Sequence, residues 1–263
     1  MSNSVENPVR SFRVDSLPVR VYPDRPSLGR DAAQMAHDHL IDVLTRQGQA
    51  AVILATGNSQ IQFLGDLVDL GGIDWSRITL FHMDEYLGLD GNHTASFRRY
   101  MKERVESRVK PKVFHYLVGD ALEPIKECER YSRLLASQSI DLCCMGVGEN
   151  GHIAFNDPPV ADLNDPLRVK IVQLDYACRM QQVGEGHFPS LEAVPQYALT
   201  LTISALCSAR KIICISPEKR KAKAVKALLE GPIGSVCPAS ALRLQPQATL
   251  LLDEDSAALL SRA

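Results

Sequence analysis

Short, uninterrupted apolar runs alternate along this chain with longer segments of helical periodicity, and this alternation limits the fold more than any other feature. A strand that is apolar at every position buries both of its faces, which is typical of a parallel sheet covered by helices on each side. The segments between the runs place their apolar side chains at helical spacing. The clearest runs are 50-AAVILAT-56, 140-IDLCCMGVG-148, 211-KIICIS-216 and 248-ATLLLD-253.

The pattern predicts a single Rossmann-like α/β domain, which is a mostly parallel sheet with helices on both faces. No long linker, fixed-period repeat or low-complexity segment interrupts it, so we expect one domain over 19–263 after an N-terminal extension over 1–18. Residues 183–196 contain several Gly and Pro and are expected to form a loop or flap. Further strands are predicted at 19–22, 77–86, 168–174 and 197–203, and helices at about 27–47, 94–107, 123–137 and 218–230 and through Phe63 and Leu67.

Composition excludes several classes of protein. The 263 residues are 45% hydrophobic and 23% charged, enough for a sizeable core. The net charge of -2 gives no electrostatic basis for binding nucleic acid or an acidic membrane surface. No apolar run approaches the ~18 residues that a membrane span needs, and the N-terminus lacks a signal core. Seven scattered cysteines indicate a reducing cytoplasm. The choice between a monomer and a homo-oligomer stays open.

A short polar turn follows the first long apolar run. Thr56, Gly57, Asn58 and Ser59 join that strand to a helix, where backbone N–H groups and two hydroxyls can hold a phosphate. The alternative is a plain turn in which Asn58 or Ser59 caps the helix. The turn is neither a Walker A loop nor a G-x-G-x-x-G fingerprint.

Two adjacent carboxylates lie in the strand predicted over 77–86. Neighbouring residues of a strand point to opposite faces, so one of Asp84 and Glu85 can enter a cleft while the other makes structural contacts. A carboxylate in a partly closed cleft can move a proton between carbons if burial raises its pKa. The alternative is a solvated turn.

The segment 145-MGVGENGHIAFNDP-158 places glycines around a lone histidine at the end of a buried strand. Gly148 and Gly151 allow backbone to approach a small polar ligand closely. His152 suits acid–base chemistry because imidazole titrates near neutral pH. Asn150 flanks this histidine, and Asp157 is placed to orient it. The alternative is a buried histidine bonded to backbone carbonyls.

Spacing argues against a metal site. His37 and His39 lie two residues apart on a predicted helix and do not share a face. The sequence has no H-E-x-x-H motif and no cluster of cysteine and histidine, so we expect no metal. It also lacks the G-x-S-x-G motif of a nucleophilic serine.

The three motifs each follow a predicted strand. In open α/β sheets, ligands bind at the carboxyl ends of the strands, where the strand order reverses. We therefore expect the phosphate-binding turn, the Asp84 carboxylate and the His152 imidazole to meet in one crevice.

The same residues resemble a known family. Thr56-Gly57, 83-MDEY-86 and 148-GENGHIAFN-156, in this order and spacing, are similar to the motifs of glucosamine-6-phosphate deaminases. The resemblance continues through 197–206, 218–231 and 236–257 and covers nearly the whole chain. The GHIAFN sequence favours these deaminases over the related 6-phosphogluconolactonases.

The resemblance implies a hydrolase and isomerase that converts glucosamine 6-phosphate and water to fructose 6-phosphate and ammonia, without a redox cofactor or a metal. It implies that His152 handles the ring-oxygen proton and that Asp84 moves a proton from C2 to C1. It further implies that Lys221 and the turn over 56–59 hold the phosphate of this small sugar substrate.

Two positions depart from the pattern of the resembled family. Asp157 stands where the family usually has Glu, and the flap lacks the arginine that grips the phosphate, so His187 is the nearest candidate. Two alternatives remain: a 6-phosphogluconolactonase-type hydrolase with His152 as the base for water, and a non-catalytic sugar-phosphate sensor. Asp84 and GHIAFN argue against the first. Residues 1–18 are too short for the DNA-binding domain of a regulator.

Overall fold

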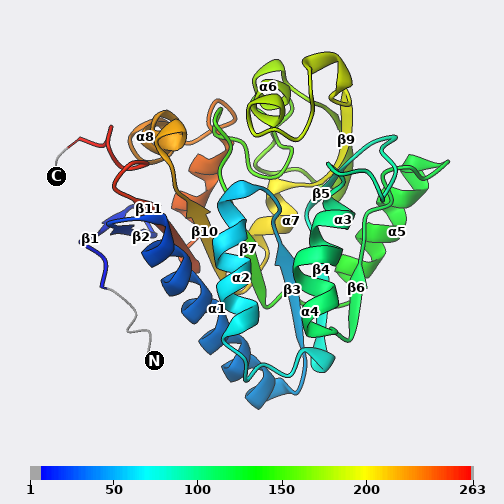
Figure 1. The fold of residues 1–263 in the computed structure, drawn as a ribbon. Coiled ribbons are helices and arrows are strands. Elements are labelled where there is room, and N and C mark those ends of the chain that lie inside the picture. The colour runs from blue at the N-terminus through cyan, green and yellow to red at the C-terminus, as the bar shows by residue number, and fades with distance from the viewer. Residues whose placement is uncertain (1–6, 262–263) are drawn as a thin grey trace.

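The computed structural model describes residues 7–261, and its centre is an eight-stranded sheet with the order β1-β2-β11-β10-β7-β3-β4-β6 (Figure 1). All neighbouring strands are parallel except β1 and β2. The predicted mostly parallel sheet is confirmed. Its strands are β1 (Arg10–Val14), β2 (Leu17–Tyr22), β3 (Ala50–Leu54), β4 (Ile78–His82), β6 (Val113–His115), β7 (Leu142–Met145), β10 (Ile212–Ser216) and β11 (Ala248–Asp253).

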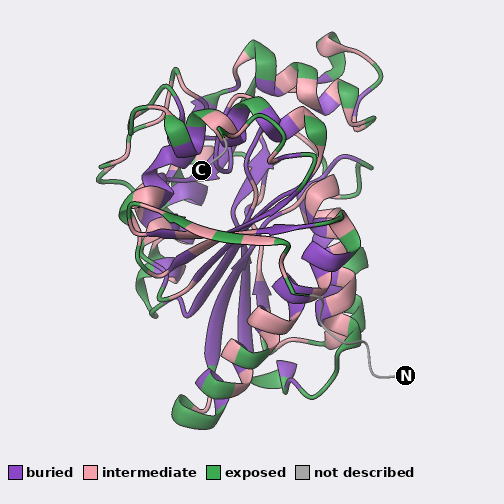
Figure 2. Cartoon of the chain, turned by 90° about the vertical axis from the view of Figure 1, so that its left-hand side faces the viewer, coloured by how far each residue is buried: buried purple, intermediate pink, exposed green. Residues whose placement is uncertain are grey.

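Helices cover both faces of this sheet, and alternate residues of its inner strands belong to one of two hydrophobic cores. In β10, Ile213 and Ile215 pack in the core with α1 and α2, whereas Ile212 and Cys214 pack in the core with α5 and α8. The inner strands β3, β4, β7 and β10 are therefore buried on both sides (Figure 2). The helices are α1 (Arg25–Gln47), α2 (Ile61–Asp69), α3 (Phe97–Met101), α4 (Ser107–Val109), α5 (Pro124–Ala136), α6 (Tyr176–Gly184), α7 (Ile203–Cys207) and α8 (Ala222–Glu230).

The predicted strand over 77–86 is two strands in two sheets. β4 ends at His82, and β5 (Asp84–Tyr86) pairs with β9 (Tyr197–Leu201) in a separate antiparallel sheet completed by β8 (Val169–Gln173). Met83 lies at the break, where its carbonyl accepts a hydrogen bond from the Leu201 N–H. The break turns Asp84 out of the main sheet and across its carboxyl edge.

The N-terminal boundary also differs from the prediction. Residues 1–6 lie outside the described part of the chain, but 10–18 are not an extension, since β1 and the start of β2 form the edge of the main sheet. The side chains of β1 alternate between exposed and half-buried. Such a strand lacks the continuous apolar run from which the other strands are predicted.

The helix predicted over 94–107 begins later, at Phe97, and contains a π-helical turn over Lys102–Glu106 before α4. β6 and α7 have no predicted counterpart, and α6 precedes the predicted flap. Within residues 7–261 no helix combines the length and apolar character required to cross a bilayer.

The strand order reverses between β3 and β7. From β3 the chain continues outward to β4 and β6, whereas the later strands β10 and β11 lie on the other side of β7. The carboxyl ends of β3 and β7 therefore flank the position at which an open α/β sheet binds its ligand.

Candidate functional site

A pocket of about 80 Å³ opens at this position, and the ends of β3, β4, β7 and β10 supply its walls. Residues of α6 and of the loop after it close the pocket from the opposite side. The expected convergence of the three motifs is thus present in the structure. The predicted site residues that line the pocket are Thr56, Gly57, Asn58, Ser59, Asp84, Gly148, His152 and Lys221.

The turn after β3 forms one end of the pocket. Asn58 begins a short 3₁₀ helix that leads into α2, so backbone N–H groups gather at this end. The turn is fixed from outside, because its Gly57 carbonyl accepts from the Tyr100 hydroxyl at 3.0 Å and its Asn58 carbonyl accepts from Arg25. Lys221 lies just before α8 and is only 3% exposed. Burial lowers the pKa of Lys221, and the nearby Glu185 opposes this shift.

Asp84 places a buried carboxylate at the wall of the pocket. Its Oδ1 has no hydrogen-bond partner within residues 7–261. Burial raises the pKa of Asp84 well above its ordinary value, and the Glu85 carboxylate raises it further. A buried, unsatisfied carboxylate at a pocket wall is costly for the fold and is typical of a catalytic base.

Glu85 points away from the pocket and caps α3. Its carboxylate accepts hydrogen bonds from the Ser96 hydroxyl at 2.8 Å and from the N–H groups of Phe97 and Arg98 at 3.2 and 2.9 Å. Its side chain is fully buried and also contacts the Arg98 guanidinium. The structure gives Glu85 a structural role, contrary to the predicted contact with substrate.

The glycines around His152 serve the histidine more than a ligand. A Cβ atom on Gly148 would lie 2.2 Å from the imidazole, so glycine lets the ring lie against the backbone. Gly151 has a φ of +85°, and a Cβ there would lie 2.8 Å from Cys237 Sγ. Gly151 does not line the pocket, in contrast to its predicted substrate contact. The loop closes as the Gly148 N–H donates to the His152 carbonyl.

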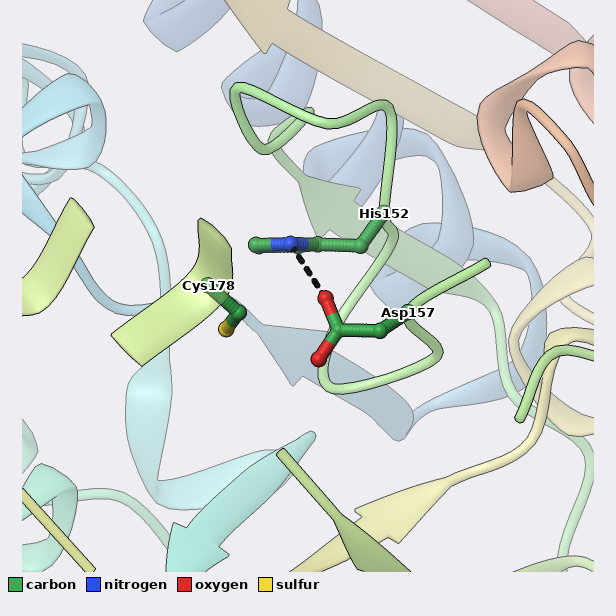
Figure 3. Close-up of side chains that lie close together, drawn as sticks. All are labelled: His152, Asp157 and Cys178. Atoms are coloured by element: carbon green, nitrogen blue, oxygen red, sulfur yellow. Dashed lines mark ion pairs between the residues drawn. The ribbon is translucent and has the colours of Figure 1, made fainter. Parts of the chain in front are cut away.

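Asp157 lies behind the imidazole, as predicted. Its Oδ1 is 2.9 Å from His152 Nδ1 but lies to one side of the ring plane, off the direction of a hydrogen bond (Figure 3). Asn150 Nδ2 and the Asp175 N–H hold the carboxylate at 2.9 and 3.1 Å. Burial alone would raise the pKa of Asp157, but His152 and these donors hold it below its ordinary value. The carboxylate therefore stabilises the imidazole mainly through its charge.

Asn150 positions the histidine loop without lining the pocket. Its Oδ1 accepts from the His152 N–H at 3.0 Å while its amide donates to Asp157. The side chain thus links the backbone of the histidine to the carboxylate behind the ring.

One group of potential metal ligands also lies here. His152, Asp157 and Cys178 are buried, and their ligand atoms lie within 4.8 Å of one another. A thiol, an imidazole and a carboxylate suit a soft divalent cation. However, burial raises the pKa of Cys178 and the nearby Asp157 raises it further, which keeps the thiol protonated. We assign no metal to these residues. Sequence spacing could not indicate the group, because Cys178 comes from α6.

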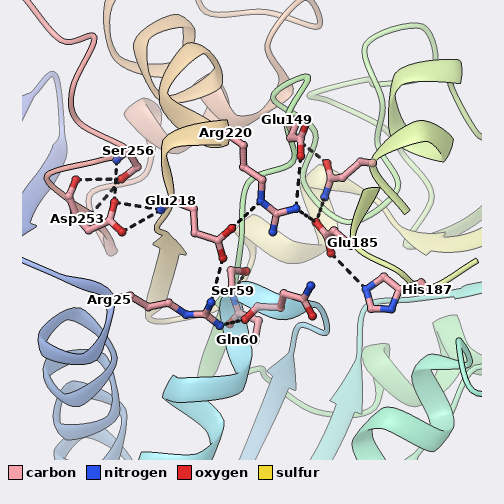
Figure 4. Close-up of polar contacts among 12 residues, drawn as sticks. Arg25, Ser59, Gln60, Glu149, Glu185, His187, Glu218, Arg220, Asp253 and Ser256 are labelled. Carbon is pink, nitrogen blue, oxygen red and sulfur yellow. Dashed lines mark hydrogen bonds and ion pairs between the residues drawn. The ribbon is translucent and has the colours of Figure 1, made fainter. Parts of the chain in front are cut away.

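The predicted phosphate contact of His187 does not fit its position. His187 is not part of the pocket wall, and its Nε2 lies 3.2 Å from Glu185 Oε2 (Figure 4). Glu185 itself lines the pocket and faces Arg220, at a distance of 2.9 Å. The sequence motifs do not predict a role for Glu185 or for Arg220. Arg220 stands beside Lys221 in the basic segment 219-KRKAKAVK-226, which is a signal for anion binding, but nothing local indicates Glu185.

Proton transfer on a small anion is the chemistry that these groups can perform together. The fold and the pocket define an α/β enzyme that works by acid–base catalysis and whose pocket is cationic at one end. Residues 23–174 match the family described as glucosamine-6-phosphate isomerases/6-phosphogluconolactonase, and the chain belongs to this family.

Comparisons with individual proteins agree. The glucosamine-6-phosphate deaminase of Cellvibrio japonicus is 34% identical over 243 residues, which cover 88% of this chain and 89% of that protein. The enzyme of the same name from Pseudarthrobacter chlorophenolicus is 33% identical over 239 residues, with coverage of 89% and 90%.

Solved structures show the same fold. A monomeric glucosamine-6-phosphate deaminase is 32% identical and superposes with a TM-score of 0.84, covering 92% of this chain and 99% of the other. A 6-phosphogluconolactonase from Thermotoga maritima has a TM-score of 0.73 at 21% identity, over 89% and 98% of the two chains, and shares the fold.

Proposed function

We propose that this chain converts glucosamine 6-phosphate and water to fructose 6-phosphate and ammonia. The observation that carries the proposal is the buried Asp84 carboxylate, whose Oδ1 has no partner within residues 7–261, in a pocket that also holds the His152 imidazole and Lys221. A base for carbon acids, a proton shuttle and a cation are the groups that this reaction needs. The relatives that bear the deaminase name are similar over almost the whole chain.

Each catalytic group has a defined step. His152 carries a proton from the C1 hydroxyl to the ring oxygen as the sugar opens, and the Asp157 carboxylate lies 2.9 Å from its Nδ1. Asp84 then takes the proton from C2 and returns it to C1, through an enolamine. The C1 oxygen gains a proton as the C2 amine loses one, so the double bond moves from C1–O to C2–N, and water hydrolyses the resulting imine at C2. Ammonia leaves, and its place is taken by the carbonyl oxygen of fructose 6-phosphate.

The phosphate is bound away from these carbons. The N–H groups and hydroxyls of the turn over 56–59 and the Lys221 ammonium form an anion-binding end of the pocket. This arrangement fixes one end of the open chain. C1 and C2 then lie toward Asp84.

Asp157 makes this site less tightly organised than a longer carboxylate would. The side chain reaches within 2.9 Å of Nδ1 but lies off the ring plane. The Asp157→Glu variant adds one methylene and can bring an oxygen into line with the ring N–H. We also place the protein in the cytoplasm, since all seven of its cysteines are free thiols.

The test is an ammonia-release assay across 2-amino-sugar 6-phosphates, with glucosamine as the unphosphorylated control and 6-phosphogluconolactone as the control for hydrolysis. We expect ammonia and fructose 6-phosphate in equal amounts from glucosamine 6-phosphate, and slow turnover of both controls. Faster hydrolysis of the lactone than release of ammonia would overturn the proposal in favour of a lactonase. Binding of phosphorylated sugars without turnover would indicate a sensor.

A further inference from the structure

The cationic end of the pocket already contains a negatively charged side chain of the protein, the carboxylate of Glu185. Arg220 and Lys221 are consecutive and both line the pocket, and the Glu185 carboxylate lines it from the loop after α6. Glu185 Oε1 lies 2.9 Å from Arg220 Nη1. Lys221 is near enough to lower the pKa of Glu185. A flap carboxylate thus faces the same two cations that a substrate phosphate would use.

Glu185 is held firmly in this place. Its side chain is 5% exposed, and it accepts a hydrogen bond from Gln181 at 2.7 Å in addition to its contacts with Arg220 and His187 (Figure 4). Burial raises its pKa, but His187 and the two cations outweigh this effect and bring the pKa to about 2. The carboxylate is therefore ionised throughout the neutral range.

Arg220 is bridged to three carboxylates. Its guanidinium contacts Glu218 at 2.6 Å, Glu185 at 2.9 Å and Glu149 at 3.5 Å. Arg25 holds Glu218 from the other side at 3.0 Å, so Glu218 belongs to the fixed frame of the pocket. Glu149 is more exposed than Glu185, at 38% of its side chain, and does not line the pocket. Among these three, Glu185 alone is both buried and on the flap.

The flap position leaves little room for a sugar phosphate. The pocket measures about 80 Å³, well below the ~300–1,000 Å³ typical of small-molecule sites. A phosphate beside Lys221 would also meet the Glu185 carboxylate, and like charges at close range in a buried site repel strongly. Substrate binding therefore requires Glu185 to move.

We propose that Glu185 is a resident anion that pairs with Arg220 beside Lys221 before substrate binds, and that the substrate's phosphate exchanges with it. The exchange opens the Nη1 side of Arg220 while its Nε stays with Glu218, and Nη1 then binds the phosphate together with Lys221. A sugar without a phosphate offers no anion for this exchange, so the flap stays paired and excludes it. The inference rests on the proposed function for the identity of the sugar but not for the binding of phosphate.

The test is calorimetric binding of inorganic phosphate to the full chain and to matched variants. Glu185→Gln removes the competing charge and keeps the shape, so we expect phosphate to bind at least tenfold more tightly. Glu149→Gln removes a charge that contacts the same guanidinium outside the pocket, and its affinity should stay within twofold of the unmodified chain. Adding Arg220→Met to Glu185→Gln should lose most of the gain.

A second variant separates charge from packing. Glu185→Asp keeps the negative charge but shortens the side chain, so its phosphate affinity should remain close to that of the unmodified chain. An equal gain in Glu185→Asp and Glu185→Gln would mean that loosening of the flap, and not exchange of anions, controls binding. Unchanged or weaker binding in Glu185→Gln would overturn the proposal. Because no turnover is measured, failure of the deamination reaction leaves this result readable.

Discussion

Replacement of Asp84 by Asn tests catalysis and stability with one change. Asn has nearly the same shape but cannot accept the C2 proton. A positioned general base contributes about 10²–10⁴-fold to a rate, equivalent to ~3–5 kcal/mol of the barrier. We expect ammonia release from glucosamine 6-phosphate to fall by at least that factor. Binding of phosphate should change little, since Asp84 is not among the groups proposed to hold it.

The same variant should unfold less easily at neutral pH. The fold raises the pKa of Asp84 above its ordinary value of 3.8, mainly through burial. Below about pH 3.8 the carboxyl is protonated in both the folded and unfolded states and costs nothing. Above this pH the carboxyl ionises readily in the unfolded state but not in the folded state, so the free energy of unfolding falls until the pH passes the folded-state pKa. The total loss is ~1.4 kcal/mol for each tenfold difference in proton affinity between the two states.

Urea denaturation of both proteins at pH 7 and pH 4 measures this difference. The Asp84→Asn variant should have the higher free energy of unfolding at pH 7, and its advantage should shrink at pH 4. An unchanged rate of ammonia release would mean that Asp84 is not the proton carrier. A variant that is less stable at pH 7 would mean that the carboxylate has a partner that favours its charge.

Three further changes probe the surroundings of the site. Glu85→Ala should lower the free energy of unfolding in urea by about 3–5 kcal/mol, because it leaves the Ser96 hydroxyl and the N–H groups of Phe97 and Arg98 without their acceptor and opens a cavity; a loss below 1 kcal/mol would contradict the capping role. Gly148→Ala should lower kcat by about 10²-fold, since its Cβ would displace the His152 ring, and near-normal kcat would refute that contact. Treatment with a chelator, or the Cys178→Ser substitution, should leave ammonia release unchanged, because none of the proposed steps uses a metal or the thiol; loss of activity with the chelator, restored by Zn²⁺, would assign a metal to that group.

The main architecture and the convergence of the site follow from the sequence for a simple reason. Strands that are apolar at every position must be parallel and covered, and their carboxyl ends then share one edge. Thr56, Asp84 and His152 each follow such a run or end it, so their meeting in one pocket depends only on this topology.

The sequence does not predict which way individual side chains point or which residues far apart in the chain are in contact. Alternation shows that Asp84 and Glu85 point apart, but the break at Met83 decides which one enters the pocket. β1 is not predicted from the sequence, because an edge strand needs no continuous apolar run. The Glu185–Arg220 pair joins residues 35 positions apart, and no local pattern marks either as a partner of the other.

The central claim is that one crevice brings the Asp84 carboxylate, the His152 imidazole and the cations to a single small sugar. A crystal structure of the Asp84→Asn variant with glucosamine 6-phosphate tests it directly, since the slow variant retains the substrate. We predict the phosphate on the turn over 56–59 with Lys221, C2 within about 3–3.5 Å of the residue 84 side chain, and the ring oxygen within hydrogen-bond reach of His152. A sugar bound elsewhere, or one with C2 turned away from residue 84, would contradict the account.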